Sequence, residues 1–152
     1  MPQGFDYWNK RSLADPKMDW AYDSGDWVQG YIDSINHPHR QIFVDEIGKL
    51  QPIDSVLELG SNTGPNLVLL KQKFPNIKIA GIDANPDAIR FAKHIWPEAD
   101  WRVGDAIQPL PYEDRSFDVV LCDAFLMYVS PQEIESVMKE INRVAKKAVM
   151  II

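Results

Sequence analysis

Short apolar runs alternate with stretches of helical periodicity over the second part of the chain. The runs predict strands over 55–59, 78–83, 101–103, 117–122 and 148–152. Apolar residues recur at helical spacing after several of these runs, which predicts helices between the strands. Strand followed by helix, with short links, is typical of βαβ units and therefore of a parallel sheet. The fully apolar strands agree with this, because parallel strands are buried on both faces.

Capping residues mark where several of these helices start. Pro65 and Pro86 suit the first helical turn, and Asn85 suits the cap before the second of them. Ser130 and Glu133 form a capping-box pattern, with the serine as cap and the glutamate at the third helical position. We therefore expect an α/β fold of three layers, with a doubly wound sheet of five parallel strands.

The first part of the chain differs in composition and in hydrophobic periodicity. Residues 1–25 are rich in aromatic and polar side chains without a clear period, whereas a helix is predicted over 27–50, with a break before Pro38. We interpret residues 1–38 as an aromatic-rich cap or lid segment and 39–152 as the sheet domain. The aromatic side chains either wall a pocket or pack against that domain; they include Tyr7, Trp8, Tyr22 and Tyr31.

Charge and composition narrow the range of partners. Of the 152 residues, 22 are acidic and 16 basic, which gives a net charge of −6. This balance disfavours nucleic acid as a partner, since phosphate contacts need clustered Lys and Arg. The single cysteine, Cys122, excludes a disulfide within the chain and a cysteine-based zinc site. The amino terminus lacks the apolar core of a signal peptide and no stretch approaches ~20 apolar residues, so we expect a cytoplasmic protein that does not enter membranes.

Ligands of such sheets bind at the carboxyl ends of the strands, and glycines and acids occur there in this sequence. The loop Gly60-Ser-Asn-Thr-Gly64 follows the first strand. It is either a binding loop that faces the start of a helix or a tight turn that needs glycine. The second strand ends in Asp83, whose carboxylate can accept hydrogen bonds from a ribose diol. The alternative is a helix-capping acid beside Asn85.

Two more acids follow the third and fourth strands. Asp105 can accept a hydrogen bond from the exocyclic amine of a purine, or it is a turn aspartate. Asp123 can face a ligand bound at the same edge. The coincidence of these groups at one edge of one sheet is much more specific than any one of them.

The stretches VLELGSNTG, GIDANPDAIRFAK, WRVGDA and FDVVLCDAFLMYV resemble the class I S-adenosylmethionine-dependent methyltransferases. The resemblance covers roughly residues 40–152 and implies a Rossmann-like fold with S-adenosylmethionine as cofactor. It implies that Glu58 supports the loop and that Asp83 holds the ribose. The other residues that it places along the cofactor are Gly60, Ser61, Asn62, Gly64, Ala84, Asp105, Ala106 and Asp123. A dinucleotide site is the weaker alternative, because G-x-G-x-x-G needs glycine where Asn62 stands.

Candidates for further roles lie outside this loop. Arg40 can pair with the carboxylate of the cofactor. His37 or His39 can act as a base, or they are surface or capping residues. Tyr128, after the fourth strand, is a further catalytic candidate. No third ligand accompanies the histidines, so no metal site is expected.

The sheet of this family normally continues past the fifth strand with a helix and an antiparallel hairpin, which are missing here. We expect either a fragment truncated at the carboxyl end, the interpretation that we favour, or a short form that covers its exposed edge as a homodimer. The favoured function is methyl transfer to a small-molecule acceptor by in-line displacement. The alternatives are a non-catalytic S-adenosylmethionine-binding module and a protein or RNA methyltransferase.

Overall fold

The computed structural model describes residues 34–152 and contains one parallel sheet with helices on both faces. In chain order the elements are α3 (Pro38–Lys49), β1 (Ser55–Leu59), α4 (Pro65–Lys73), β2 (Lys78–Asp83), α5 (Pro86–Ile95), β3 (Asp100–Val103), β4 (Phe117–Cys122), the 3-10 helix η1 (Leu126–Tyr128), α6 (Ile134–Val144) and β5 (Ala145–Ile151).

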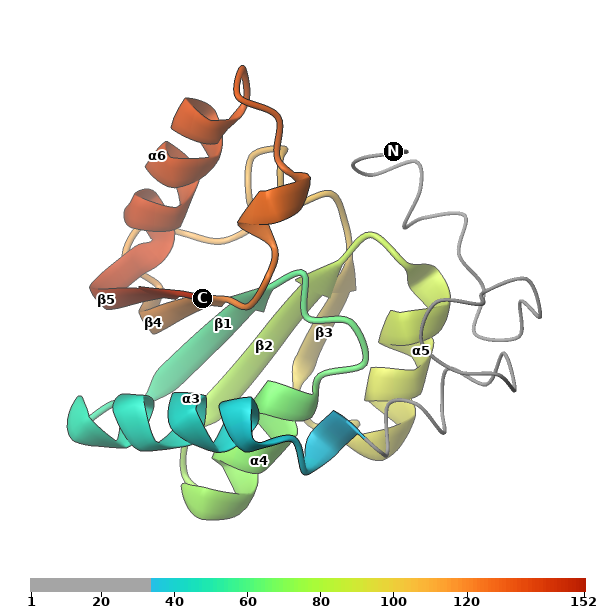
Figure 1. The fold of residues 1–152 in the computed structure, drawn as a ribbon, viewed down its shortest axis with the longest axis vertical. Helices are drawn as coiled ribbons and strands as arrows, with labels where there is room; N and C mark the ends of the chain where they lie inside the picture. Colours follow the sequence, from blue (N-terminus) through green and yellow to red (C-terminus); the bar gives the residue numbers. More distant parts are fainter. Residues whose placement is uncertain (1–33) are drawn as a thin grey trace.

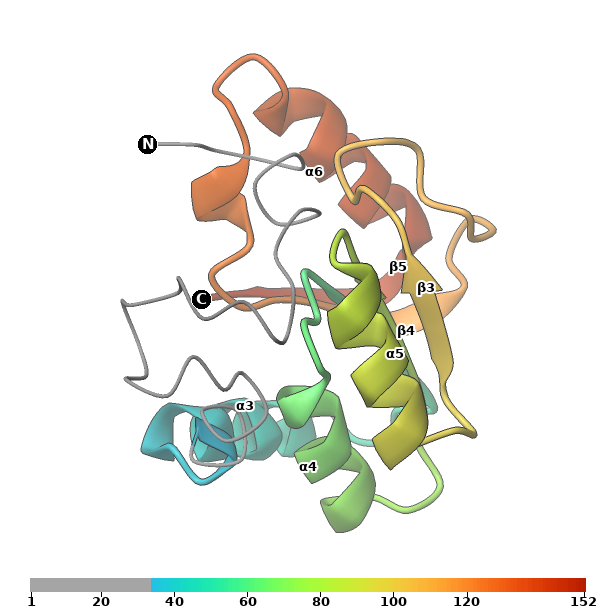
Figure 2. The same cartoon turned by 90° about the vertical axis from the view of Figure 1, so that its right-hand side faces the viewer.

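The strands lie in the order β3-β2-β1-β4-β5, and every neighbouring pair is parallel. Helices α3, α4 and α5 cover one face, and α6 covers the other (Figures 1 and 2). The first strand, β1, lies in the middle of the sheet, with β2 and β3 on one side and β4 and β5 on the other, so that β1 and β4 are neighbours at the switch point. This confirms the three-layer, doubly wound fold with five parallel strands.

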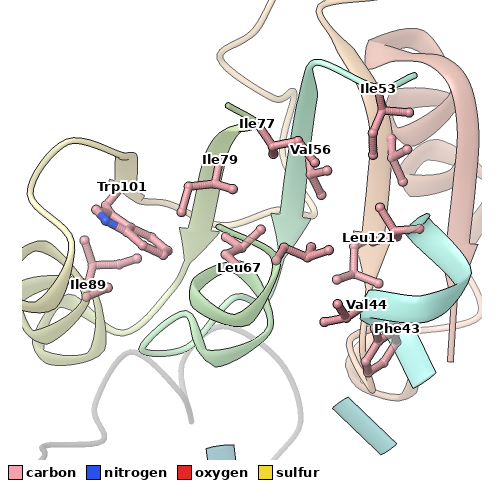
Figure 3. Close-up of a cluster of buried hydrophobic side chains, with 14 residues drawn as sticks. Phe43, Val44, Ile53, Val56, Leu67, Ile77, Ile79, Ile89, Trp101 and Leu121 are labelled. Carbon is pink, nitrogen blue, oxygen red and sulfur yellow. The ribbon is translucent and has the colours of Figure 1, made fainter. Parts of the chain in front are cut away.

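Each face of the sheet carries its own apolar core. The larger core lies under α3, α4 and α5, and Figure 3 shows Trp101 beside Ile89 at one end of it and Phe43 beside Val44 at the other. The second core lies under α6 and includes the thiol of Cys122, whose pKa burial raises to about 12. Alternate residues of the central strands point into the two cores, which explains why these strands are apolar throughout.

Some predicted boundaries were wrong. The fifth strand begins at Ala145 rather than at 148, and α6 begins at Ile134 rather than at 131. In the predicted capping box, the Glu133 carboxylate does accept from the Ser130 backbone N–H at 3.3 Å. The Ser130 hydroxyl, however, donates to that carboxylate at 2.5 Å instead of capping the helix, so a turn precedes α6.

The predicted helix over 27–50 is interrupted where expected. α3 begins at Pro38, with His37 as its cap residue, and residues 27–33 lie outside the described part. The aromatic residues of the proposed lid, Tyr7, Trp8, Tyr22 and Tyr31, also lie outside it.

The connection from β3 to β4, residues 104–116, contains no helix. Side chains of α6 hold it in place through hydrogen bonds. The Arg143 guanidinium donates to the backbone oxygens of Tyr112 at 2.8 Å and Leu110 at 3.1 Å. Glu140 accepts from the Leu110 N–H at 2.9 Å and also pairs with Arg143 at 2.8 Å. These bonds replace the backbone hydrogen bonds that a crossover helix would make within itself.

Arg143→Met is expected to destabilise the protein by about 1–3 kcal/mol, because it leaves the two carbonyl groups without their charged donor. Amide hydrogen exchange should rise mainly in residues 104–116. The matched control is Arg90→Met, which removes an arginine that is 76% exposed in its pair with Asp87. Equal effects of the two substitutions on unfolding free energy would contradict the role given to Arg143.

β5 forms one edge of the sheet and has an exposed apolar end, where Ile151 is 45% exposed and Ile152 56%. The homodimer through this edge stays a prediction. None of the helices within residues 34–152 has the length and apolar character needed to cross a bilayer.

Candidate functional site

The loop after β1 turns sharply and is tied to the end of β2. Gly60, Asn62 and Gly64 have positive φ angles of 68°, 50° and 81°. The N–H groups of Gly60 and Ser61 both donate to the Ile82 carbonyl, at 2.9 and 3.1 Å. The loop therefore continues the hydrogen bonding of the sheet beyond the end of the strand.

Side chains also pack closely against both glycines of the loop, more closely at Gly64 than at Gly60. A Cβ on Gly60 would lie 3.1 Å from Phe125 Cδ2, and one on Gly64 would lie 2.2 Å from Trp101 Cη2. Gly60 thus makes room at the carboxyl edge of the sheet, whereas Gly64 makes room in the core beneath α4. The turn interpretation accounts for Gly64, and Gly60 borders the edge where a ligand would bind.

Asp83, at the end of β2, binds the loop with its carboxylate. Its Oδ2 accepts from the Asn62 N–H and its Oδ1 from the Asn85 N–H, both at 2.8 Å. Burial raises the pKa of Asp83, and these two bonds partly offset the increase. The cap of α5 is the Asn85 side chain, which accepts from the N–H groups of Asp87 and Ala88. Each Asp83 oxygen keeps a further lone pair, so the carboxylate can still accept from a diol.

A cluster of charged and polar groups lies on the other side of the loop. It consists of His39 and Arg40 of α3, Glu58 of β1, Asn66 of α4 and Asp123 after β4, and we call it the Arg40 cluster. Arg40 Nη1 is 2.8 Å from Asn66 Oδ1 and 3.8 Å from Asp123 Oδ2. His39 Nε2 is 3.4 Å from the same Asp123 oxygen. The amino-terminal end of α3 thus meets the carboxyl ends of β1 and β4, as the prediction for Arg40 requires.

Glu58 lies at the bottom of the Arg40 cluster and is 2% exposed. Its Oε1 accepts from Asn66 Nδ2 at 2.6 Å, whereas Oε2 has no hydrogen-bond partner among the described residues. Burial raises the pKa of Glu58 to about 8, against the hydrogen bond from Asn66, which lowers it. At neutral pH this carboxyl is therefore largely protonated and can donate a hydrogen bond.

The two histidines differ in their contacts. His37 Nδ1 accepts from the His39 N–H at 3.4 Å and so caps α3, as the capping interpretation predicts. The Nδ1 atoms of His37 and His39 are 2.5 Å apart, within hydrogen-bond distance of each other. The side chain of His39 is 38% exposed and reaches Asp123, whereas His37 is an exposed residue.

The other predicted residues lie along the same edge. Asp105 Oδ1 accepts from the Ile107 N–H at 3.0 Å, as expected for a turn aspartate. Ala106 is buried in the second core. Ala84 follows Asp83 and is half-buried, and Tyr128 ends η1 after β4. No group of three or more His, Cys, Asp and Glu side chains that could hold a metal ion occurs within residues 34–152.

Two features of the site were not predicted from the sequence. Asn66 binds three members of the Arg40 cluster, and the only signal for it is a small polar residue in an otherwise apolar buried set of α4. The buried hydroxyl groups of Ser61 and Thr63 have no hydrogen-bond partner among the described residues. These atoms are buried beneath the loop, where the Ser61 hydroxyl faces Gly81 of β2.

Comparison with known proteins identifies the family to which the chain belongs. Residues 56–148 match the family model described as methyltransferase domain. A TehB-like SAM-dependent methyltransferase from Corynebacterium glutamicum has a similar structure, with a TM-score of 0.62 and 25% identity over 71% of this chain and 60% of that one. The fold is that of the class I S-adenosylmethionine-dependent methyltransferases. The chain belongs to the methyltransferase domain family.

Two further comparisons extend this assignment. The demethylmenaquinone methyltransferase of Thermotoga maritima is 32% identical over 108 residues, which are 71% of this chain and 45% of the relative. The plantazolicin methyltransferase BpumL, whose structure was solved in complex with SAH, shares the fold with a TM-score of 0.63 at 18% identity, over 80% of this chain and 50% of that one. The chain thus spans about half the length of these proteins.

Proposed function

We propose that this chain binds S-adenosylmethionine across the loop after β1 and takes part in methyl transfer to a small-molecule acceptor. The observation that carries the proposal is the placement of Asp83 on one side of this loop and the Arg40 cluster on the other. A ligand that lies across the loop meets an acceptor for hydroxyl groups at one end and a pair of opposite charges at the other. This is the polarity of a nucleoside joined to an amino acid.

The residues suit the two ends of the cofactor in different ways. Asp83 would accept from the ribose hydroxyls, with Ala84, Asp105 and Ala106 on the side of the adenine. Arg40 would pair with the α-carboxylate, and Asp123 would face the α-ammonium. The residues that would line the middle are Gly60, Ser61, Asn62 and Gly64, which turn the backbone sharply after β1.

The bound cofactor supplies an activated methyl group, so the protein has mainly to align donor and acceptor. Alignment alone can contribute roughly 7–11 kcal/mol to catalysis. The ends of β1 and β4 are buried and that of β2 is half-buried, so the acidic groups are held on or beside rigid strands, which favours such alignment. His39 stands beside Asp123, with His37 in contact with it, and either would take a proton from an acceptor that must lose one.

A small-molecule acceptor is supported by the net charge of −6 and by the name of the Thermotoga relative, a demethylmenaquinone methyltransferase. Titration calorimetry with S-adenosylmethionine and S-adenosylhomocysteine tests the binding step, and the absence of heat with both would refute the proposal. Incubation with methyl-labelled cofactor and a metabolite extract then separates an enzyme from a non-catalytic binding module. Label recovered in protein or RNA, and not in small molecules, would favour the other class of acceptor.

Asp83→Asn is expected to weaken binding of S-adenosylhomocysteine by about 1.5–3 kcal/mol, because one accepting carboxylate oxygen becomes an NH2 group that can only donate, so a hydrogen bond to a charged group is lost. The asparagine keeps one acceptor oxygen for the loop. Asp100→Asn is the control, since Asp100 is an exposed acid at the start of β3, at the opposite end of the sheet. Normal binding by Asp83→Asn would show that the ribose assignment is wrong.

A further inference from the structure

Asn66 occupies an unusual place for an amide side chain. It is the second residue of α4, it is 1% exposed, and the neighbouring buried residues of that helix, Leu67 and Val68, are apolar. A buried amide is costly unless its hydrogen-bonding atoms are satisfied. Asn66 therefore has a strict set of partners, and these are the charged groups of the Arg40 cluster.

The amide joins three other chain segments. Its Oδ1 accepts from Arg40 Nη1 at 2.8 Å, and its Nδ2 donates to Glu58 Oε1 at 2.6 Å and to Asp123 Oδ2 at 3.0 Å. The orientation of the amide is fixed by chemistry, since a guanidinium has only donors and must face the oxygen. The Nδ2 group then necessarily faces the two carboxyl groups.

This arrangement holds Arg40 and Asp123 close without letting them form a direct hydrogen bond. The distance of 3.8 Å between Arg40 Nη1 and Asp123 Oδ2 is beyond the usual range of 2.7–2.9 Å for a charge-assisted bond. Two of the other four N–H donors of Arg40 are held by Ser34, with Nε 2.8 Å from its carbonyl oxygen and Nη2 3.2 Å from its hydroxyl. Asn66 bridges the remaining gap with one acceptor and one donor.

We propose that Asn66 is a positioning residue that keeps the Arg40 and Asp123 charges apart, so that both can pair with the amino-acid end of the cofactor. A closed Arg40–Asp123 ion pair would compete with a zwitterionic ligand, because each charge would already have its partner. The pair held by Asn66 instead presents a cation and an anion side by side, with 3.8 Å between Arg40 Nη1 and Asp123 Oδ2. This inference rests on the proposed function, and it adds a residue that acts through Arg40 and Asp123.

The test compares two ligands that differ only at that end. S-adenosylhomocysteine carries the amino acid, and 5′-methylthioadenosine lacks it. Asn66→Leu, of similar volume, is expected to weaken S-adenosylhomocysteine by about 10- to 100-fold and to change 5′-methylthioadenosine by less than about threefold, as measured by calorimetry. Asn142→Leu is the matched control, because Asn142 is an exposed amide of α6 on the opposite face of the sheet.

A second variant keeps the test decisive if Asn66→Leu does not fold. Asn66→Ser retains a hydroxyl that is too short to bridge the cluster, so the same selective loss is expected. In an Arg40→Met background, either substitution should have little further effect on S-adenosylhomocysteine, because Asn66 then has no guanidinium to hold. Equal losses for both ligands, or no loss for either, would overturn the role of Asn66. A wild-type protein that binds neither ligand would instead overturn the proposed function itself.

Discussion

Glu58→Gln is expected to stabilise the protein at pH 8 by roughly 3–5 kcal/mol and to remove most of the fall in stability between pH 5 and 8. The pKa of Glu58 is raised from 4.5 to about 8 because the carboxyl is fully buried at the end of β1. Between these two values the folded protein holds a proton that the unfolded chain has released. The free energy of unfolding therefore falls as the pH rises, by at most about 1.4 kcal/mol per pH unit. The contribution of the bound proton to stability is complete only below about pH 4.5.

The amide of the variant cannot ionise, yet it can accept from Asn66 as the acid does. Urea unfolding at several pH values from 5 to 8.5 measures the effect. The slope of unfolding free energy against pH should be smaller for the variant than for the wild-type protein. Glu98→Gln serves as the control, because it makes the same chemical change on an exposed side chain. Parallel stability profiles for the wild-type protein and Glu58→Gln would show that Glu58 is not held as a neutral acid.

Gly64→Ala is expected to destabilise the protein by about 3 kcal/mol or more, from two additive causes. The φ angle of 81° is left-handed, which costs roughly 1–2 kcal/mol for a residue with a Cβ. The new Cβ would also lie 2.2 Å from Trp101 Cη2, so the buried indole must shift, and overpacking of this kind costs about 1–3 kcal/mol.

The two causes can be separated by a double-mutant cycle with Trp101→Phe, which removes the part of the ring that meets the new methyl group. The steric part of the cost should disappear in that background, whereas the backbone part should remain. Thermal and urea unfolding of the four proteins give the coupling energy. The same cost of Gly64→Ala beside tryptophan and beside phenylalanine would argue against the packing explanation.

The sequence predicted β1, β2 and β4 with the bounds that the structure shows, because these strands are buried on both faces and leave uninterrupted apolar runs. β5 was predicted too short because two lysines follow its first residue, Ala145. Lys146 and Lys147 lie at the exposed edge and approach the buried Asp118 carboxylate at 3.7 and 3.3 Å. An edge strand does not need the apolar pattern of a central one, so its start carries no hydrophobic signal.

The candidate site was predicted unevenly for a similar reason. Asp83 and the loop after β1 are close in the chain to the strands that position them, so their spacing was informative. The Arg40 cluster gathers residues from α3, β1, α4 and the end of β4, and only the fold brings these segments together. Arg40 could be proposed from its charge alone, whereas Asn66 could not, because nothing in the sequence shows that its partners are two carboxyl groups and a guanidinium.

The burial of Cys122 has a practical consequence for experiments on this protein. It is the single cysteine of the chain, it is 0% exposed, and burial raises the pKa of its thiol to about 12, so it resists alkylation while the protein is folded. A thiol introduced at the surface can then be labelled selectively without first replacing the native one. Met127 is 68% exposed on η1, close in the chain to Asp123, and Met127→Cys would carry a fluorophore at the rim of the site. Ligand binding could then be followed in real time by fluorescence.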